Sequence, residues 1–381
     1  MTPRFSADLP MFLDDAHRAL DEAHVGALEG LDLFDHDAPR ALGALRASRV
    51  FELLVPAACA GRALAGTPEV AVSVRALSVT REALAYRSPL ADSIFAVQGL
   101  GSHPIVLTPE FPGRSTILRE VVSGARICAF ALTEPEAGSD VASMRTVARR
   151  DGAGWILDGE KAFISNVGIA DHYVVFANAD PSLGKKGISA FLVDREAPGL
   201  SLEPVLMSSP HPLGRLRMNA CRAQAMIGEV GRGLRLALGT LDVFRTSVGA
   251  AACGMARRAL DSTLARVKAR VQFGKSLAEQ PIVQEKLAIM ATELDAARLL
   301  VYRAAWCKDR GQAAATEVAM AKLYATEAAQ RIIDQAVQLH GGLGVVLGTD
   351  VEQLYREIRP LRIYEGTTEI QTLIIGGALV K

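Results

Sequence analysis

A glutamate near the end of the chain has the surroundings of a general base. Glu365 stands between Tyr364 and Gly366 in the stretch RIYEGTTEIQ, residues 362–371. Apolar neighbours remove water from a carboxylate and raise its pKa above the usual value of about 4.3. A carboxylate of that kind suits proton abstraction near neutral pH. An exposed loop glutamate without a role is the alternative interpretation of this stretch in isolation.

Three further stretches have residue types that suit ligand binding. The polar loop LTEPEAGSD, residues 132–140, offers backbone N–H groups and hydroxyls. In RVQFGK, Arg270 suits a phosphate and Phe273 suits a flat ring. The stretch QLHGG, residues 338–342, ends a helix in two glycines, where backbone can approach a ligand. Taken singly, each stretch is better interpreted as an ordinary turn or helix end.

Several familiar motifs are excluded by their spacing. Gly342 and Gly344 follow a helical pattern rather than a strand, and the next glycine, Gly348, comes one residue late for a dinucleotide fingerprint. The GKS at 274–276 lacks the first P-loop glycine, since Ala269 stands there. The seven histidines show no metal-ligand spacing, so we predict no metal site.

The bulk composition limits the classes of partner. Lys plus Arg equals Asp plus Glu at 42 each, which argues against nucleic-acid or membrane-surface binding driven by net charge. The sequence has no uninterrupted run of about 18 apolar residues, so we predict no membrane span. Five scattered cysteines and an N-terminus without a secretory pattern favour a reducing compartment. We therefore expect a cytoplasmic protein.

The elements that must position these residues fall into three regions. Residues 1–124 are predicted to form an N-terminal helical domain, with one apolar face at Val70, Val74, Leu77 and Leu84 interrupted by Arg81. Residues 125–228 are predicted to form a small antiparallel β domain. Its hairpin turns are expected at the Asp-Gly pairs of positions 151–152 and 158–159, with further strands at 173–177 and 188–193.

Residues 229–381 are predicted to return to helix. Three apolar stripes recur at three- and four-residue spacings and predict long antiparallel helices. The stripes are Val248, Ala252, Met255, Ala259 and Leu260; Leu287, Met290, Leu294, Ala297 and Val301; and Ile332, Ile333, Ala336 and Leu339. The predicted fold is therefore mainly α with a central β domain.

The four stretches, in this order, resemble those of the acyl-CoA dehydrogenase family over nearly all of the chain from about Val55. The resemblance implies an N-terminal helical domain, a middle antiparallel β domain and a C-terminal four-helix bundle. It also implies FAD in a cleft between the β domain and the helices, and a homotetramer, at least a dimer.

The resemblance carries site residues onto this chain one by one. Those implied to bind FAD, some of them for a neighbouring subunit, are Thr133, Ser139, Phe163, Ser165, Arg270, Gln272, Phe273, Gln338, Gly342, Thr367 and Glu369. Those implied to contact the acyl-CoA substrate are Ser139, Asp242, Arg245, Tyr364 and Gly366.

The resemblance also implies the chemistry. Glu365 matches the family's catalytic base, which removes the thioester α-proton while a hydride leaves the β-carbon for the flavin. Some relatives place the base one residue before the arginine matched by Arg245, but Phe244 stands there. An electron-transfer flavoprotein is the expected acceptor of the electrons.

Two departures from the family pattern leave other functions open. Residues 57–61 lack the usual Gly-Gly pair, and residues 214–224 lack the usual acidic residue and Val-Pro. The acyl group is therefore carried by CoA or by an acyl carrier protein, and its length and branching stay open. The alternatives are a flavin oxidase or another specialised enzyme of the same fold, and a non-catalytic flavoprotein.

Overall fold

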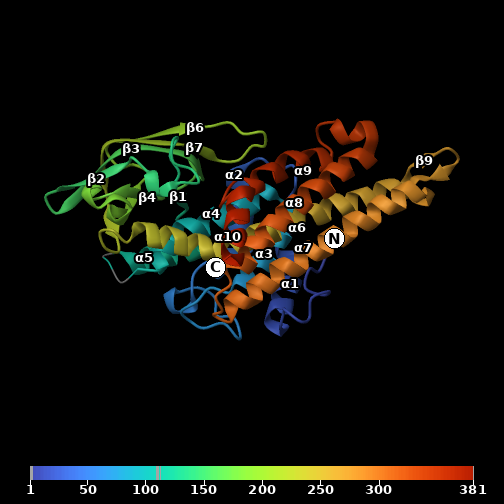
Figure 1. Cartoon of the computed structure of the whole chain (residues 1–381), viewed down its shortest axis with the longest axis horizontal. Coiled ribbons are helices and arrows are strands. Elements are labelled where there is room, and N and C mark those ends of the chain that lie inside the picture. The colour runs from blue at the N-terminus through green and yellow to red at the C-terminus, as the bar shows by residue number, and fades with distance from the viewer. Residues whose placement is uncertain (1–2, 109–110, 112, 381) are drawn as a thin grey trace. The chain divides into compact units, whose positions relative to one another are not determined.

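Helices precede and follow a run of strands, as the residue patterns predict (Figure 1). The computed structural model describes residues 3–108, 111 and 113–380. The helices before the strands are α1 Asp15–Ala27, α2 Ala38–Ala47, α3 Val74–Arg87, α4 Pro89–Val106 and α5 Arg114–Ser123. Within the described residues, no helix is long and apolar enough to cross a membrane.

The chain divides into two compact units that interleave along the sequence. The first unit comprises Met1–Asp35, Val74–Asp92 and Arg245–Lys381, and the second comprises His36–Ser73 and Ser93–Phe244. The division differs from the three consecutive domains predicted, whose boundaries stay a prediction.

One sheet dominates the second unit. Its eight strands follow the order β6-β7-β3-β2-β4-β5-β8, with β1 beside β4. The strands are β1 Cys128–Ala131, β2 Val147–Asp151, β3 Gly154–Ser165, β4 His172–Asn178, β5 Ile188–Asp194, β6 Leu200–Pro204, β7 Leu213–Ala223 and β8 Ala225–Ile227. Most pairs are antiparallel, but β1 and β2 both pair with β4 in parallel, so the sheet is mixed rather than purely antiparallel.

The two Asp-Gly pairs have different roles in the sheet. Asp151 and Gly154 close the β2–β3 hairpin as predicted, and Gly152 in the turn has a φ of 57°. The predicted turn at Asp158 and Gly159 is wrong, because both residues lie inside β3 at a shift in its register with β7. Gly159 is needed there, since a Cβ atom would lie 2.7 Å from Oγ1 of Thr146.

Long helices build the C-terminal part of the first unit, which begins at Arg245 within the first of them. They are α6 Gly233–Ala269, α7 Pro281–Asp309, α8 Ala315–His340, α9 Asp350–Ile358 and α10 Thr368–Leu379. The short hairpin of β9 Val271–Gln272 and β10 Lys275–Ser276 joins α6 to α7 at their far tip (Figure 1). The predicted stripes of α6, α7 and α8 meet in one buried core, with Leu287 and Leu339 half-buried at its edge.

Helix α3 differs from its predicted pattern. All of its residues from Val74 to Tyr86 are buried, so it has no solvent face. Val70 lies before the helix and is 78% exposed. The prediction that it belongs to the apolar face of this helix is therefore wrong. The burial of the Arg81 charge is compensated by Asp92, whose carboxylate accepts two hydrogen bonds of 2.8 Å from the guanidinium.

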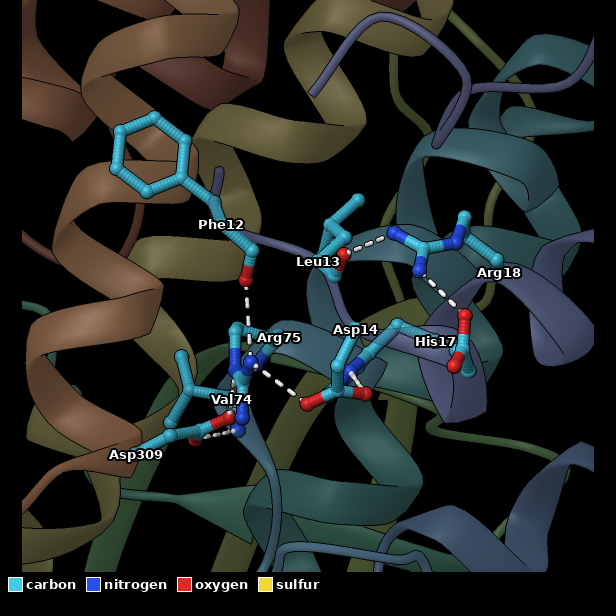
Figure 2. A network of polar contacts seen from close by, with 9 residues as sticks. Phe12, Leu13, Asp14, His17, Arg18, Val74, Arg75 and Asp309 are labelled. Atoms are coloured by element: carbon cyan, nitrogen blue, oxygen red, sulfur yellow. Dashed lines mark hydrogen bonds and ion pairs between the residues drawn. The ribbon is translucent and has the colours of Figure 1, made fainter. Parts of the chain in front are cut away.

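A polar network ties the start of α3 to the end of α7 (Figure 2). The carboxylate of Asp309 accepts hydrogen bonds from the backbone N–H groups of Val74, at 2.6 Å, and Arg75, at 3.3 Å. Arg75 Nε donates to the same carboxylate at 2.8 Å. Its Nη1 reaches the Phe12 carbonyl and the Asp14 carboxylate, each at 3.1 Å. Asp309 thus caps α3 from another helix and neutralises a buried arginine.

We expect Asp309→Ala to lower the free energy of unfolding by about 3 kcal/mol, because it leaves the buried Arg75 with half of its charge compensation. Circular dichroism during urea unfolding measures the loss. The matched control is Asp15→Ala, since Asp15 pairs with Arg18 through a side chain that is 97% exposed. The control should change stability by less than about 1 kcal/mol. Equal losses in the two variants would contradict the buried cap.

Candidate active site

The turn that carries Glu365 has an unusual backbone. Glu365 lies between the 3₁₀ helix Arg359–Arg362 and α10 with a φ of 53°, and Gly366 follows with a φ of 96°. A left-handed conformation costs a residue with a side chain about 1 kcal/mol or more. Gly366 has a steric reason as well, since a Cβ atom there would lie 2.5 Å from Nε2 of Gln371. The surrounding structure must therefore hold this turn in place.

Donors from three helices hold the carbonyl groups of the turn. Arg245 of α6 donates from Nε to the Glu365 carbonyl at 2.8 Å. Lys322 of α8 donates from Nζ to the Gly366 carbonyl at 2.8 Å, and Gln371 of α10 donates to the same oxygen at 2.9 Å. Two successive carbonyls thus face two cations.

The carboxyl group of Glu365 is left available. Its Oε2 atom is buried and accepts no hydrogen bond from any residue that the structure describes. Burial raises the pKa of Glu365, although the charges of Arg81, Arg245 and Lys322 act to lower it. A carboxylate that is poorly solvated and lacks a donor has the properties of a general base.

The cation with the largest effect on Glu365 is itself neutralised. Arg81 of α3 pairs with Asp92 of α4 and donates from Nη1 to the hydroxyl of Ser247 at 3.1 Å. Both charged side chains are almost fully buried. Because Asp92 lies against Arg81, the pair adds a strong local dipole with little net charge near the base.

Sequence reasoning missed Lys322, Arg81 and Asp92 as members of this cluster. Lys322 is fully buried, and burial lowers its pKa to about 8. The sequence does hold a signal: Lys322 follows Val318 by four residues and precedes Ala329 by seven, which places a cation on the buried face of α8.

A second group of predicted residues meets in the sheet. The N–H group of Ala162 on β3 donates to the Thr133 carbonyl at 2.9 Å, which brings the loop after β1 beside the end of β3. Phe163 follows with a φ of 55° and a ring that is 61% exposed. The hydroxyls of Thr133 and Ser165 have no partner within the part of the chain that the structure describes. Free hydroxyls beside an exposed ring fit a flat, polar cofactor such as flavin.

A buried ion pair holds the loop after β1. Lys161 Nζ donates to the Glu134 carboxylate at 2.7 Å and to the Leu132 carbonyl at 3.1 Å. The same carboxylate accepts the N–H groups of Arg145 at 2.6 Å and Thr146 at 3.0 Å. Burial lowers the pKa of Lys161 to about 8, against the charge of Glu134. The loop that carries Thr133 is thus fixed on both sides.

The remaining predicted residues are distributed over the chain. Ser139 is exposed in the second unit, and Asp242 lies about one turn before Arg245 on α6. Tyr364 is 36% exposed. Thr367 caps α10 by accepting the N–H of Ile370 at 3.4 Å. A hydrogen bond from its own backbone and one from Thr367 lower the pKa of the exposed Glu369.

The other predicted FAD ligands are remote from Glu365 within one chain. At 1.5 Å per residue, the end of α6 at Ala269, directly before Arg270, lies about 36 Å beyond Arg245, and Gln338 lies about 24 Å beyond Lys322 along α8. Arg270 and Gln272 are exposed, and the Phe273 ring is 96% exposed at the tip of the β9–β10 hairpin. Gly342 is exposed beyond the end of α8. One chain therefore presents these residues away from its own base.

Comparison with known proteins gives consistent relatives. Residues 129–221 match the acyl-CoA dehydrogenase middle domain, and residues 231–380 match the C-terminal domain of the same family. Human mitochondrial short-chain specific acyl-CoA dehydrogenase is 44% identical over 264 residues, which cover 68% of this chain and 64% of that protein. The chain thus spans less than two thirds of the human enzyme.

Two further relatives bear on flavin chemistry. A subunit of the caffeyl-CoA reductase–Etf complex of Acetobacterium woodii is 38% identical, over 74% of this chain and 76% of that protein. A glutaryl-CoA dehydrogenase of Mycobacterium smegmatis, solved in complex with FADH2, superposes with a TM-score of 0.86 at 27% identity, covering 99% of this chain and 98% of that one. The chain belongs to the acyl-CoA dehydrogenase family, whose members are FAD-dependent oxidoreductases that act on CH–CH bonds.

Proposed function

We propose that this chain dehydrogenates an acyl-CoA thioester at its α and β carbons, with Glu365 as the base that removes the α-proton. The observation that carries the proposal is the buried, unpartnered Oε2 of Glu365 on a turn held by Arg245 and Lys322. Such an atom can take a proton without first breaking a hydrogen bond. Its raised pKa brings its basicity closer to that of the weakly acidic proton it must remove.

FAD is the cofactor, and it supplies the two-electron acceptor when bound. We assign its flavin to the hydroxyls of Thr133 and Ser165 and to the exposed ring of Phe163, with Ser139, Thr367 and Glu369 at further contacts. Fixed donors are more useful than mobile ones, because they bind the cofactor without losing side-chain freedom. The Lys161–Glu134 pair provides that rigidity for the loop of Thr133.

The substrate is assigned to residues near the base. The backbone N–H of Glu365 is proposed to donate to the thioester carbonyl and stabilise the negative charge that develops on its oxygen. Asp242, Arg245, Tyr364 and Gly366 are assigned to the same end of the substrate. Ser139 is proposed to contact the CoA portion.

A neighbouring copy is proposed to complete the cofactor site. Residues near or beyond the far ends of α6 and α8 are remote from Glu365 within one chain, so we assign them to the FAD of a partner in a homotetramer: Arg270, Gln272, Phe273, Gln338 and Gly342. The relative in a complex with Etf supports an electron-transfer flavoprotein as the acceptor. A cytoplasmic location stays a prediction.

Replacing Glu365 with Gln should abolish most of the chemistry without unfolding the site. The amide keeps the size of the side chain but removes the base. Reduction of the flavin by a saturated acyl-CoA should slow by roughly two to four orders of magnitude. Anaerobic stopped-flow absorbance measures this rate. The control is Glu285→Gln, an exposed glutamate on α7, which should keep the wild-type rate. A Glu365→Gln enzyme that matches the control would place the base elsewhere.

The pH dependence of flavin reduction should report the raised pKa of Glu365. The base acts when deprotonated, so the rate should fall as the pH decreases through the pKa of Glu365. Because burial raises that pKa, the fall should centre above the ordinary glutamate value of about 4.3. Single-turnover rates across pH, with substrate saturating, measure the midpoint. A midpoint at or below the ordinary value would contradict a desolvated base.

Arg270→Ala should weaken FAD binding in the assembled protein. The substitution removes a cation from the surface assigned to a partner's FAD, and bound cofactor stabilises the folded state. Flavin content after gel filtration and the thermal midpoint with and without added FAD measure the effect. Lys268→Ala is the matched control, since Lys268 is an exposed cation two residues earlier. Full retention of FAD by monomeric protein would refute the shared site.

A further inference from the structure

We propose that Lys322 is a positioning residue for the reaction: its ammonium holds the Gly366 carbonyl and thereby fixes the turn from which Glu365 acts. The inference rests on the proposed function of Glu365. It concerns a residue on α8 that lies 44 positions from the carbonyl it binds.

The first observation is that the ammonium of Lys322 is buried and has few hydrogen-bond partners. The residue is fully buried, and the described residues offer its Nζ one hydrogen bond, to the Gly366 carbonyl at 2.8 Å. A buried ammonium with one neutral acceptor is costly to the fold. Most other buried positions on α8 hold apolar residues, such as Ala321, Ala325 and Ile332. A stabilising packing role would therefore be served better by an apolar residue.

The second observation is what the held carbonyl does to the backbone. Peptide groups are planar, so a fixed carbonyl also fixes the N–H of the next residue. Arg245 holds the peptide that follows Glu365, and Lys322 holds the peptide that follows Gly366. The two planes flank Gly366, so Gly366 keeps its left-handed conformation and the peptide that follows Glu365 keeps its orientation, which limits the directions open to the Glu365 carboxyl. The two cations act on consecutive peptides from different helices.

The third observation separates Lys322 from Gln371. Gln371 binds the same carbonyl at 2.9 Å, but it lies only five residues away on the helix that the turn begins. That bond lies within the turn and the first residues of α10, so it does not join the turn to another helix. Lys322 belongs to α8, whose buried face contributes to the main core of the first unit. Lys322 is therefore the donor that ties Gly366 to a rigid element.

The charge of Lys322 also acts on Glu365. The charged groups that face this cluster are Arg81 of α3, Asp92 of α4, Arg245 of α6, Glu327 and Lys322 of α8, and Glu369 of α10. Lys322 lowers the pKa of Glu365, against the larger effect of burial. Removing its charge should therefore shift the pH dependence of catalysis to higher pH, which a purely structural contact would not do.

The test compares Lys322→Met with wild-type holoenzyme in single turnovers across pH. Methionine keeps the length and apolar stem but has neither charge nor donor. The flavin reduction rate should fall roughly ten- to a hundredfold, the scale expected when a reacting group is misplaced. The acid limb is the part of the pH profile in which the flavin reduction rate falls as the pH decreases. Its midpoint should move to higher pH, with FAD content retained. The control is Lys286→Met, which removes a 2.9 Å bond to Gln335 between α7 and α8 and should leave both quantities unchanged.

Two further substitutions of Lys322, to Arg and to Gln, separate the effect of its charge from an effect on folding. Lys322→Arg keeps the charge, so its acid limb should return toward the wild-type midpoint even where its rate does not recover. Should Lys322→Met fail to hold FAD, Lys322→Gln replaces it, with the same shift expected. A lower rate with an unmoved acid limb, or wild-type behaviour, overturns the proposal. A wild-type enzyme that no acyl-CoA reduces overturns the proposed function instead.

Discussion

The left-handed turn at Glu365 and Gly366 is the constraint around which the first unit is organised. A residue with a side chain does not stay in this conformation unless neighbouring groups hold it. Here α6, α8 and α10 each direct a donor to one of two successive carbonyls. Helices of the bundle thus do more than bury apolar surface, because their side chains hold the backbone of the turn that carries Glu365.

The second unit uses the same physical device at a different place. Lys161, like Lys322, is a fully buried lysine that donates to a loop carbonyl and has its pKa lowered by burial to about 8. The difference lies in compensation, since Lys161 pairs directly with Glu134 whereas Lys322 has no such carboxylate at hydrogen-bond distance among the described residues. In each unit, a lysine in a helix or strand holds a loop that carries predicted site residues.

A buried ion pair also ties the N-terminal segment to the rest of the first unit. Arg298 of α7 donates from Nε to Glu82 at 2.7 Å, and Tyr302 donates to the other carboxylate oxygen at 2.5 Å. Arg298 also binds the Phe5 carbonyl, so the segment before α1 lies over the α3–α7 contact. Close packing accompanies these bonds, since a Cβ atom on Gly254 would lie 2.1 Å from the Glu82 carbonyl. Removing one partner of such a network leaves a buried charge, which is more costly than losing a surface pair.

Local sequence patterns were enough to predict the order of helices and strands, the apolar stripes of the bundle and the stretch that contains Glu365. These follow from local periodicity and from short motifs, which depend on neighbouring residues. The parallel pairing of β1, the bulge at Gly159, and the burial of Arg81 and Lys322 came only from the tertiary structure. Each depends on groups distant in sequence: Asp92 neutralises Arg81, and the Gly366 carbonyl, 44 residues away, accepts from Lys322. A charged residue on an apolar stripe shows that a partner is needed, and folding alone decides which partner that is.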